Sequence, residues 1–185
     1  MIMAFWTSTP EQDPKRNFRF QVYMTGVQDT EPAIWWAKKV AKPNFTVAES
    51  KHVYLGHSFY YPGKVEWQPI SMTLVDPLNP GSLFRLNKVI RQAGYRIPGD
   101  ANTLVTQSKN KAAGALGSVQ IVQIDADGNQ VETWDLKHPF IKKLAFSELD
   151  YENDDISTID IELRYDWATC LTVDGEVAGT FYTAQ

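Results

Sequence analysis

The chain has 185 residues and a formal net charge of −4, and 43% of its residues are hydrophobic, 12% aromatic and 22% charged. This composition is typical of a globular domain with a sizeable core, and it excludes a disordered chain. The single cysteine, Cys170, excludes an intrachain disulfide. No apolar run approaches the roughly 20 residues of a membrane helix, and the start MIMAFW lacks the basic region and long apolar core of a signal peptide.

Charge is divided unevenly along the chain. Residues 1–118 carry a net charge of +6, whereas residues 119–185 carry a net charge of −10. The opposite charges either mix on one folded surface or form oppositely charged faces, and the second arrangement would suit self-association. The acidic half argues against tight nucleic-acid binding, which requires a basic surface.

The first half of the chain predicts strands joined by loops. Apolar and polar residues alternate over 18–24, which predicts a strand with one buried face. Further strands are expected over 45–50 and 65–75. The segment 51–63 between them alternates poorly, is rich in Tyr and Phe, and ends in a turn signal at Pro62-Gly63.

One helix is predicted in the middle of the chain. Ser82 fits an N-cap, apolar residues follow at helical spacing from Leu83 to Ile90, and Gly94 is a natural stop. The next stretch, 98–117, consists of small and polar residues, and we expect it to be a mobile loop.

The last third of the chain predicts the most regular strands. Strands over 119–124 and 131–136 are joined by an Asp-Gly hairpin turn, and another strand covers 140–146. Residues 159–167 alternate strictly and predict an amphipathic strand, after which 171–185 can add a short hairpin. The whole pattern predicts a mainly β fold, an antiparallel β-sandwich or barrel with one flanking α-helix.

The sequence offers no convincing catalytic, cofactor or metal site. Asp125 begins a segment that starts like a calcium loop, but Leu136 stands where that loop needs its glutamate. His52 and His57 have an odd separation, which places them on opposite faces of a strand. The acidic run 150–155 is interpreted as a solvated loop. We therefore expect a protein that is not an enzyme and that needs no cofactor.

Several short motifs follow one another along residues 16–168. In chain order they are RNFRFQV at 16–22, YPGKVEW at 61–67, ISMTL at 70–74, the helix at 83–93, the hairpin at 119–136 with the pattern I-x-x-x-D-x-x-G-x-x-x-x-x-W-x-L, the strand and Leu-Asp pair at 140–150, and the closing strand at 159–167. This series resembles the tail tube proteins of contractile-tailed bacteriophages, the family that includes the T-even tail tube subunit.

The resemblance implies a β-barrel subunit that forms hexameric rings, stacked into a hollow tube inside a contractile sheath. It divides the chain into an N-terminal arm (1–15), the tail-tube domain (16–168) and a C-terminal extension (169–185). The implied function is that of a structural tail tube subunit whose lumen conducts the viral genome into the host. The implied partners are further copies of the chain, the sheath, baseplate and tail-terminator proteins, and the tape-measure protein and double-stranded DNA that pass through the lumen without specific binding.

The implied location is the virion tail, assembled in the host cytoplasm. Two related interpretations stay open, namely the secreted tube protein of a bacterial contractile injection system and a baseplate tube-initiator protein. Other classes also stay open: a β-barrel binding module, such as a carbohydrate binder with exposed aromatic residues, or an enzyme whose site is not recognised.

Three assembly sites are predicted. The aromatic segment is expected to project and to pack on the adjacent ring, because aromatic side chains are typical interface anchors. The resemblance implies that one sheet of each subunit lines the channel, and the polar face of the closing strand would then face the DNA. The loop 98–117 is expected to order on assembly against the acidic run of a neighbouring subunit. The chosen residues are Tyr54, Phe59, Tyr60 and Tyr61 for ring stacking, Thr158, Asp160, Glu162, Arg164 and Asp166 for the lumen, and Lys109 and Lys111 for the loop.

Overall fold

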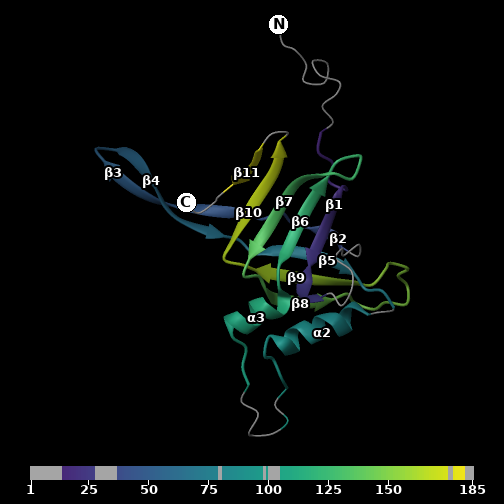
Figure 1. Cartoon of the computed structure of the whole chain (residues 1–185). Coiled ribbons are helices and arrows are strands. Elements are labelled where there is room, and N and C mark those ends of the chain that lie inside the picture. Colours follow the sequence, from purple (N-terminus) through teal and green to yellow (C-terminus); the bar gives the residue numbers. More distant parts are fainter. Residues whose placement is uncertain are drawn as a thin grey trace.

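The computed structural model describes residues 14–27, 37–78, 81–97, 99, 105–174 and 177–181. Most of the predicted N-terminal arm and part of the predicted loop 98–117 lie outside these residues. Two antiparallel sheets pack against each other, two helices lie at one end of them, and a long two-stranded arm projects from the side (Figure 1). The predicted mainly β class is confirmed.

The first sheet has five strands in the order β1-β6-β7-β10-β11. Its strands are β1 (Phe20–Met24), β6 (Val119–Ile124), β7 (Gln130–Lys137), β10 (Trp167–Asp174) and β11 (Val177–Phe181). The predicted Asp-Gly hairpin joins β6 to β7: Asp125 accepts hydrogen bonds from the backbone N–H groups of Asp127 and Asn129, and Gly128 adopts a φ of 86°. Because β10 pairs with β7, the expected boundary between 168 and 169 falls inside a strand of the main sheet.

The second sheet has four strands in the order β2-β5-β9-β8. Its strands are β2 (Ala37–Val40), β5 (Ile70–Val75), β9 (Thr158–Arg164) and β8 (Phe140–Phe146). The predicted closing strand ends three residues early, at Arg164. The chain turns at Asp166, and Trp167 opens β10 in the other sheet, so the expected single strand 159–167 is shared between the two layers.

The core lies between the two sheets and follows the period of two. In β1, β5 and β9 alternate side chains are buried, which is the alternation that the sequence shows over 18–24 and 159–163. Phe18 is the exception, because β1 begins at Phe20 and leaves the Phe18 side chain 75% exposed. The largest fully buried side chains are Val22, Met24, Ile70, Met72, Leu74, Leu86, Leu116, Val119, Leu136, Ile159, Ile161 and Leu163.

Two helices, α2 (Ser82–Gln92) and α3 (Lys109–Leu116), lie at one end of the sandwich beside the 3₁₀ turn η1 (Thr25–Val27) (Figure 1). The helix α2 is the predicted one, but its N-cap is Gly81 rather than Ser82. The side chain of Asp76 accepts the hydrogen bond from the Ser82 N–H at 3.0 Å. That bond ties the start of the helix to the end of β5.

The helix α3 contradicts the prediction of a loop over 98–117. Ser108 caps its start by accepting a hydrogen bond from the Lys111 N–H, and Gly117, at a φ of 69°, ends it. Ala115 and Leu116 are buried in the core. The backbone of α3 approaches Gly26 so closely that a Cβ at Gly26 would lie 1.9 Å from the carbonyl oxygen of Ala115.

The arm is formed by β3 (Phe45–Tyr54) and β4 (His57–Trp67), which pair with each other and with no strand of the two main sheets. Of its strand residues, Phe45 and Trp67 at the root are partly buried, and the rest are exposed. Figure 1 shows the arm leaving the sandwich sideways.

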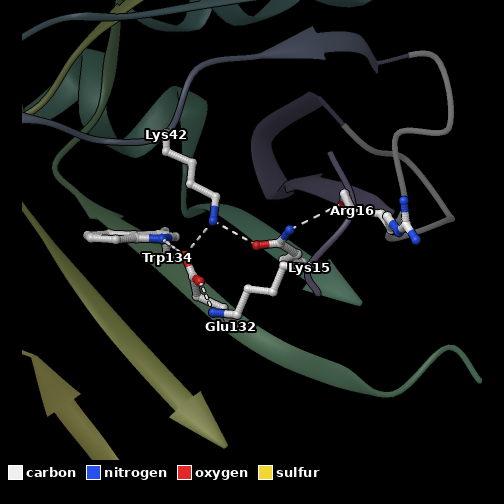
Figure 2. Close-up of polar contacts among 6 residues, drawn as sticks. Lys15, Arg16, Lys42, Glu132 and Trp134 are labelled. Atoms are coloured by element: carbon white, nitrogen blue, oxygen red, sulfur yellow. Dashed lines mark hydrogen bonds and ion pairs between the residues drawn. The ribbon is translucent and has the colours of Figure 1, made fainter. Parts of the chain in front are cut away.

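A buried carboxylate joins the segments that meet at one end of the sandwich. Glu132, on the core side of β7, is 7% exposed. Its carboxylate accepts hydrogen bonds from Lys15 at 2.6 Å, from Lys42 at 2.8 Å and from the indole N–H of Trp134 (Figure 2). Lys42 also donates to Gln123, whose side chain in turn donates to the carbonyl oxygen of Arg16.

Electrostatics keeps Glu132 ionised in this position. Burial raises the pKa of its carboxyl, but the bonds from Lys15, Lys42 and Trp134 outweigh burial and lower that pKa from 4.5 to about 2. A carboxyl with a depressed pKa in the folded state contributes stability above its ordinary pKa. That contribution is lost as the pH falls from about 5 to about 2.

We predict that Glu132→Gln lowers the free energy of unfolding by about 2 kcal/mol at neutral pH, less than the full pKa shift would give, because both lysines are half exposed and screened by solvent. The difference from the wild type should shrink as the pH falls below about 4. Urea unfolding at several pH values measures it. Glu148→Gln, on an exposed residue, is the matched control and should leave the pH dependence unchanged. A wild-type advantage of the same size at all pH values would contradict the prediction.

Candidate functional site

The arm turns at its tip through two residues with positive φ. Leu55 adopts a φ of 46° and Gly56 a φ of 81°, the combination of a type I′ turn, whose twist matches that of an antiparallel hairpin. The turn predicted at Pro62-Gly63 is therefore wrong. Those residues lie within β4 at a bulge, where Gly63 and Lys64 lie opposite the single residue Ala48 of β3. A Cβ at Gly63 would lie 3.0 Å from the carbonyl oxygen of Ala48.

The register of the arm sorts its aromatic side chains onto two faces. Residues paired across antiparallel strands share a face, and Tyr54 pairs with His57, His52 with Phe59, and Ser50 with Tyr61. Tyr54, Phe59 and Tyr61 therefore lie on one face of the arm. Tyr60 lies on the other face, where the Lys51 ammonium sits 5.9 Å from its ring centre. All four predicted stacking residues are about half exposed or more, an apolar surface typical of an interface.

The root of the arm is fixed to the sandwich by a row of aromatic rings. The rings of Phe45 and Trp67 lie 5.2 Å apart, and those of Trp67 and Tyr165 lie 5.9 Å apart. Tyr165 is buried where the chain passes from β9 to β10, and burial raises the pKa of its hydroxyl. Gln68 closes the root by donating its N–H to the carbonyl oxygen of Asn44 at 2.9 Å. The arm thus projects from a defined anchor.

The polar side chains of β9 lie on the outer face of the second sheet, but that face is not purely acidic. Asp160 accepts a hydrogen bond from Thr73 at 2.6 Å, and Glu162 forms an ion pair with Lys142 at 2.7 Å. Arg164 pairs with Glu66 of the arm root at 3.3 Å. Lys39 of β2 and Lys143 of β8 line the same hollow as Asp160 and Glu162.

Asp166 and Lys109, predicted for two different sites, meet within one chain. Asp166, predicted as part of the polar face, lies beyond the end of β9, at the corner between β9 and β10. Lys109, at the start of α3, donates to its two carboxylate oxygens at 2.6 and 2.7 Å, and the Nδ1 atom of His138 lies 3.0 Å away. The Lys109 bond holds the pKa of Asp166 below its usual value. Lys111 is exposed, and its backbone N–H binds the capping Ser108.

Sequence reasoning missed the residues that position the arm. Trp67, Tyr165 and Glu132 come from distant parts of the chain. The one available signal was Glu132, an acid at a core-facing position of a strand. Among the described residues, His, Cys, Asp and Glu form no group of three or more that could hold a metal ion. No helix in the described ranges is long and apolar enough to cross a membrane.

No family model and no curated protein matches the sequence, but solved structures do. A chain of the anti-feeding prophage baseplate is similar, with a TM-score of 0.64 and 17% identity over 88% of this chain and 98% of that one. The chain has the fold found in contractile injection systems. Two chains from the PVC extracellular contractile injection system, one from its sheath/tube terminator and one from its sheath–tube complex, give TM-scores of 0.62 and 0.60. Both are 17% identical over 86% of this chain, and the match covers 98% and 93% of those chains. The fold expected from the tail tube resemblance is confirmed.

We predict that Trp67→Ala loosens the arm without unfolding the sandwich, because Trp67 joins the rings of Phe45 and Tyr165. Amide hydrogen exchange in β3 and β4 should accelerate by roughly tenfold, while exchange in β6 and β7 should change little. Tyr60→Ala, a truncation of an exposed ring on the same strand, is the control and should leave the rest of the arm protected. Equal acceleration in the arm and in β6 would show that Trp67 supports the whole core instead.

Proposed function

We propose that the chain is the structural subunit of a contractile-tail tube, assembled as hexameric rings that stack into a hollow cylinder. The observation that carries this proposal is the arm. It extends 10 residues along β3 and 11 along β4 with almost no contact to its own core, and it exposes an aromatic surface. A free two-stranded hairpin is marginal in water, so a partner that covers this surface would stabilise it.

The fold supports the proposal because it leaves sheet edges unpaired. Within the described residues, β1 and β11 are the edges of the first sheet and β2 and β8 those of the second. Exposed edges favour pairing with another chain, and identical subunits joined by one heterologous contact close into a ring. The role is structural, and it requires neither a catalytic group nor a cofactor.

In a phage tail, the proposed partners are the sheath protein outside the tube and the baseplate and tail-terminator proteins at its ends. The tape-measure protein and double-stranded DNA would occupy the lumen, and the subunit would be found in the virion tail after assembly in the host cytoplasm. The solved structures of similar fold support the coarser part of this proposal, since they include a baseplate, a terminator and a sheath–tube complex.

A second candidate is the tube protein of a bacterial contractile injection system. The similar structures named above come from such systems, and this supports the second candidate. Tubes purified from the producing cell separate the two. Encapsidated double-stranded DNA in connected particles supports the phage tail, whereas sheathed tubes with no capsid and no DNA support the injection system. A baseplate tube initiator would form single rings that do not elongate.

We predict that replacing residues 52–61 by a short Gly-Ser turn yields a folded protein that no longer forms tubes. The replacement removes Tyr54, Phe59, Tyr60 and Tyr61, but it leaves the Phe45–Trp67 anchor in place. Electron microscopy and sedimentation measure assembly, and circular dichroism checks the fold. Replacing the exposed turn 126–128 between β6 and β7 by Gly-Ser is the matched control and should still assemble. Normal tubes from the shortened arm would remove it from the stacking contact.

The polar face of β9 is proposed to line the lumen, and a charge change tests this. Asp160→Lys together with Glu162→Lys should leave tubes intact and make them retain double-stranded DNA, because phosphates bind basic surfaces in a salt-dependent way. Retention should disappear as the salt concentration is raised. Asp127→Lys, in the exposed β6–β7 turn, is the control. Tubes of the double variant that bind no more DNA than this control would place the β9 face outside the lumen.

A further inference from the structure

The loop between β8 and β9 combines exposed apolar side chains with acids. In the segment 147–157, which we call the acidic loop, the side chains of Leu149, Tyr151 and Ile156 are all well exposed. The loop and Lys38 border an open hollow of about 570 Å³. A solvated loop has no physical need for three exposed apolar anchors, and apolar residues rimmed by charge are typical of a protein-binding surface.

The acids of this loop fall into two groups. Asp150 is used locally, because its carboxylate accepts the Glu152 N–H at 3.1 Å. The carboxylates of Glu148, Glu152, Asp154 and Asp155 are exposed and form no ion pair with any described residue. Glu148, Asp150 and Asp155 line the hollow, and Glu152 and Asp154 lie on the same loop, so the loop produces a negative field that favours a basic partner.

The helix α2 presents a surface of opposite charge. Its inner side buries Ser82, Leu86 and Val89. Its outer side carries Phe84, Lys88 and Arg91, which follow one another at the i, i+4, i+7 spacing of one helix face. Arg96 lies just beyond the helix and is exposed. We call these four residues the basic helix face, and its one apolar member, Phe84, is 72% exposed.

The two surfaces lie on different parts of the subunit. In Figure 1 the helix α2 covers the lower end of the sandwich, while the acidic loop projects to the right from the ends of β8 and β9. Two complementary surfaces at different positions on identical subunits form a heterologous contact, the kind that closes into a ring.

We propose that the acidic loop of one subunit docks on the basic helix face of the next subunit in the ring, with Phe84 inserted into the hollow beside Leu149, Tyr151 and Ile156. The apolar contact supplies the anchor, and the exposed carboxylates of the loop meet Lys88, Arg91 and Arg96 at its rim. This inference rests on the proposed function, since it names the contact between subunits within a ring. Stacking by the arm is a separate contact between rings.

Two charge-reversed variants test the proposal. The loop variant carries Glu148→Lys, Glu152→Lys and Asp154→Lys, and the helix variant carries Lys88→Glu, Arg91→Glu and Arg96→Glu. Each variant alone opposes like charges at every contact, so we expect its ring formation to fall at least tenfold in sedimentation velocity. An equimolar mixture places opposite charges together at each contact between unlike subunits. The mixture should therefore restore rings in which the two variants alternate, which suits an even number of subunits and is readable by native mass spectrometry.

Controls and outcomes separate this inference from the proposed function. Asp127→Lys changes charge on a different exposed surface and should form rings normally. Phe84→Ser, at an exposed position that folding does not require, should weaken rings without any change of charge. The proposed contact is wrong if both reversed variants form rings as the wild type does. It is also wrong if neither variant forms rings alone and their equimolar mixture forms none either. In both cases the tube function stands. Binding of the acidic loop to another tail protein but not to a second copy would also overturn it. A wild-type protein that forms neither rings nor tubes would overturn the tube function and this contact with it.

Discussion

One buried carboxylate determines how the outer segments of this protein meet the sandwich. Glu132 binds Lys15 of the N-terminal segment and Lys42, which lies three residues before the arm begins. An ion pair in such a position adds little net stability compared with a well-packed apolar residue, because burying the charges costs much of what their attraction returns. Its effect is on geometry. Removing either lysine leaves a buried charge with one partner fewer, so arrangements in which the arm root or the N-terminal segment moves away are disfavoured.

The sandwich and the arm differ in how much of their apolar surface is buried within the subunit. The sandwich buries its own apolar side chains, since alternate side chains of two sheets fill one core and the helices cover its end. In the arm, the pairing of β3 with β4 supplies the backbone hydrogen bonds, but the aromatic side chains stay exposed to water. A subunit that must stay folded alone and still bind its neighbours benefits from this division. Burial in the core stabilises the folded subunit. Burial of the exposed arm stabilises the assembly, and it takes place only when a second subunit covers the arm.

Sequence periodicity predicted the sandwich because one-sided burial imposes a period of two, as Ile159, Ile161 and Leu163 show. The helix α3 escaped prediction because its residues, KNKAAGAL, carry no apolar stripe, and only Ser108 at its cap signals a start. The projecting arm was predicted from poor alternation, although its turn was placed at Pro62-Gly63 instead of Leu55-Gly56. The mixed charge of the β9 face could not be predicted from the sequence of β9, because Lys142 and Lys143 belong to another strand. Pairing between strands far apart in the sequence decides which charges share a surface.

The opposite charges of the two halves of the chain now have a structural meaning. Part of the asymmetry is neutralised inside the subunit, where Lys15, Lys42 and Lys109 of the basic half pair with Glu132 and Asp166 of the acidic half. These pairs join segments at least 57 residues apart and so help to fix the fold. The rest of the asymmetry is left over at the surface, where Glu148, Glu152 and Asp154 have no described partner. Charge that folding does not neutralise remains for association, and because exposed charges are screened over roughly 10 Å at 0.1 M salt, it acts on a neighbouring subunit only at close range. Such a field aligns subunits that already touch, whereas the apolar arm and loop residues must supply the affinity.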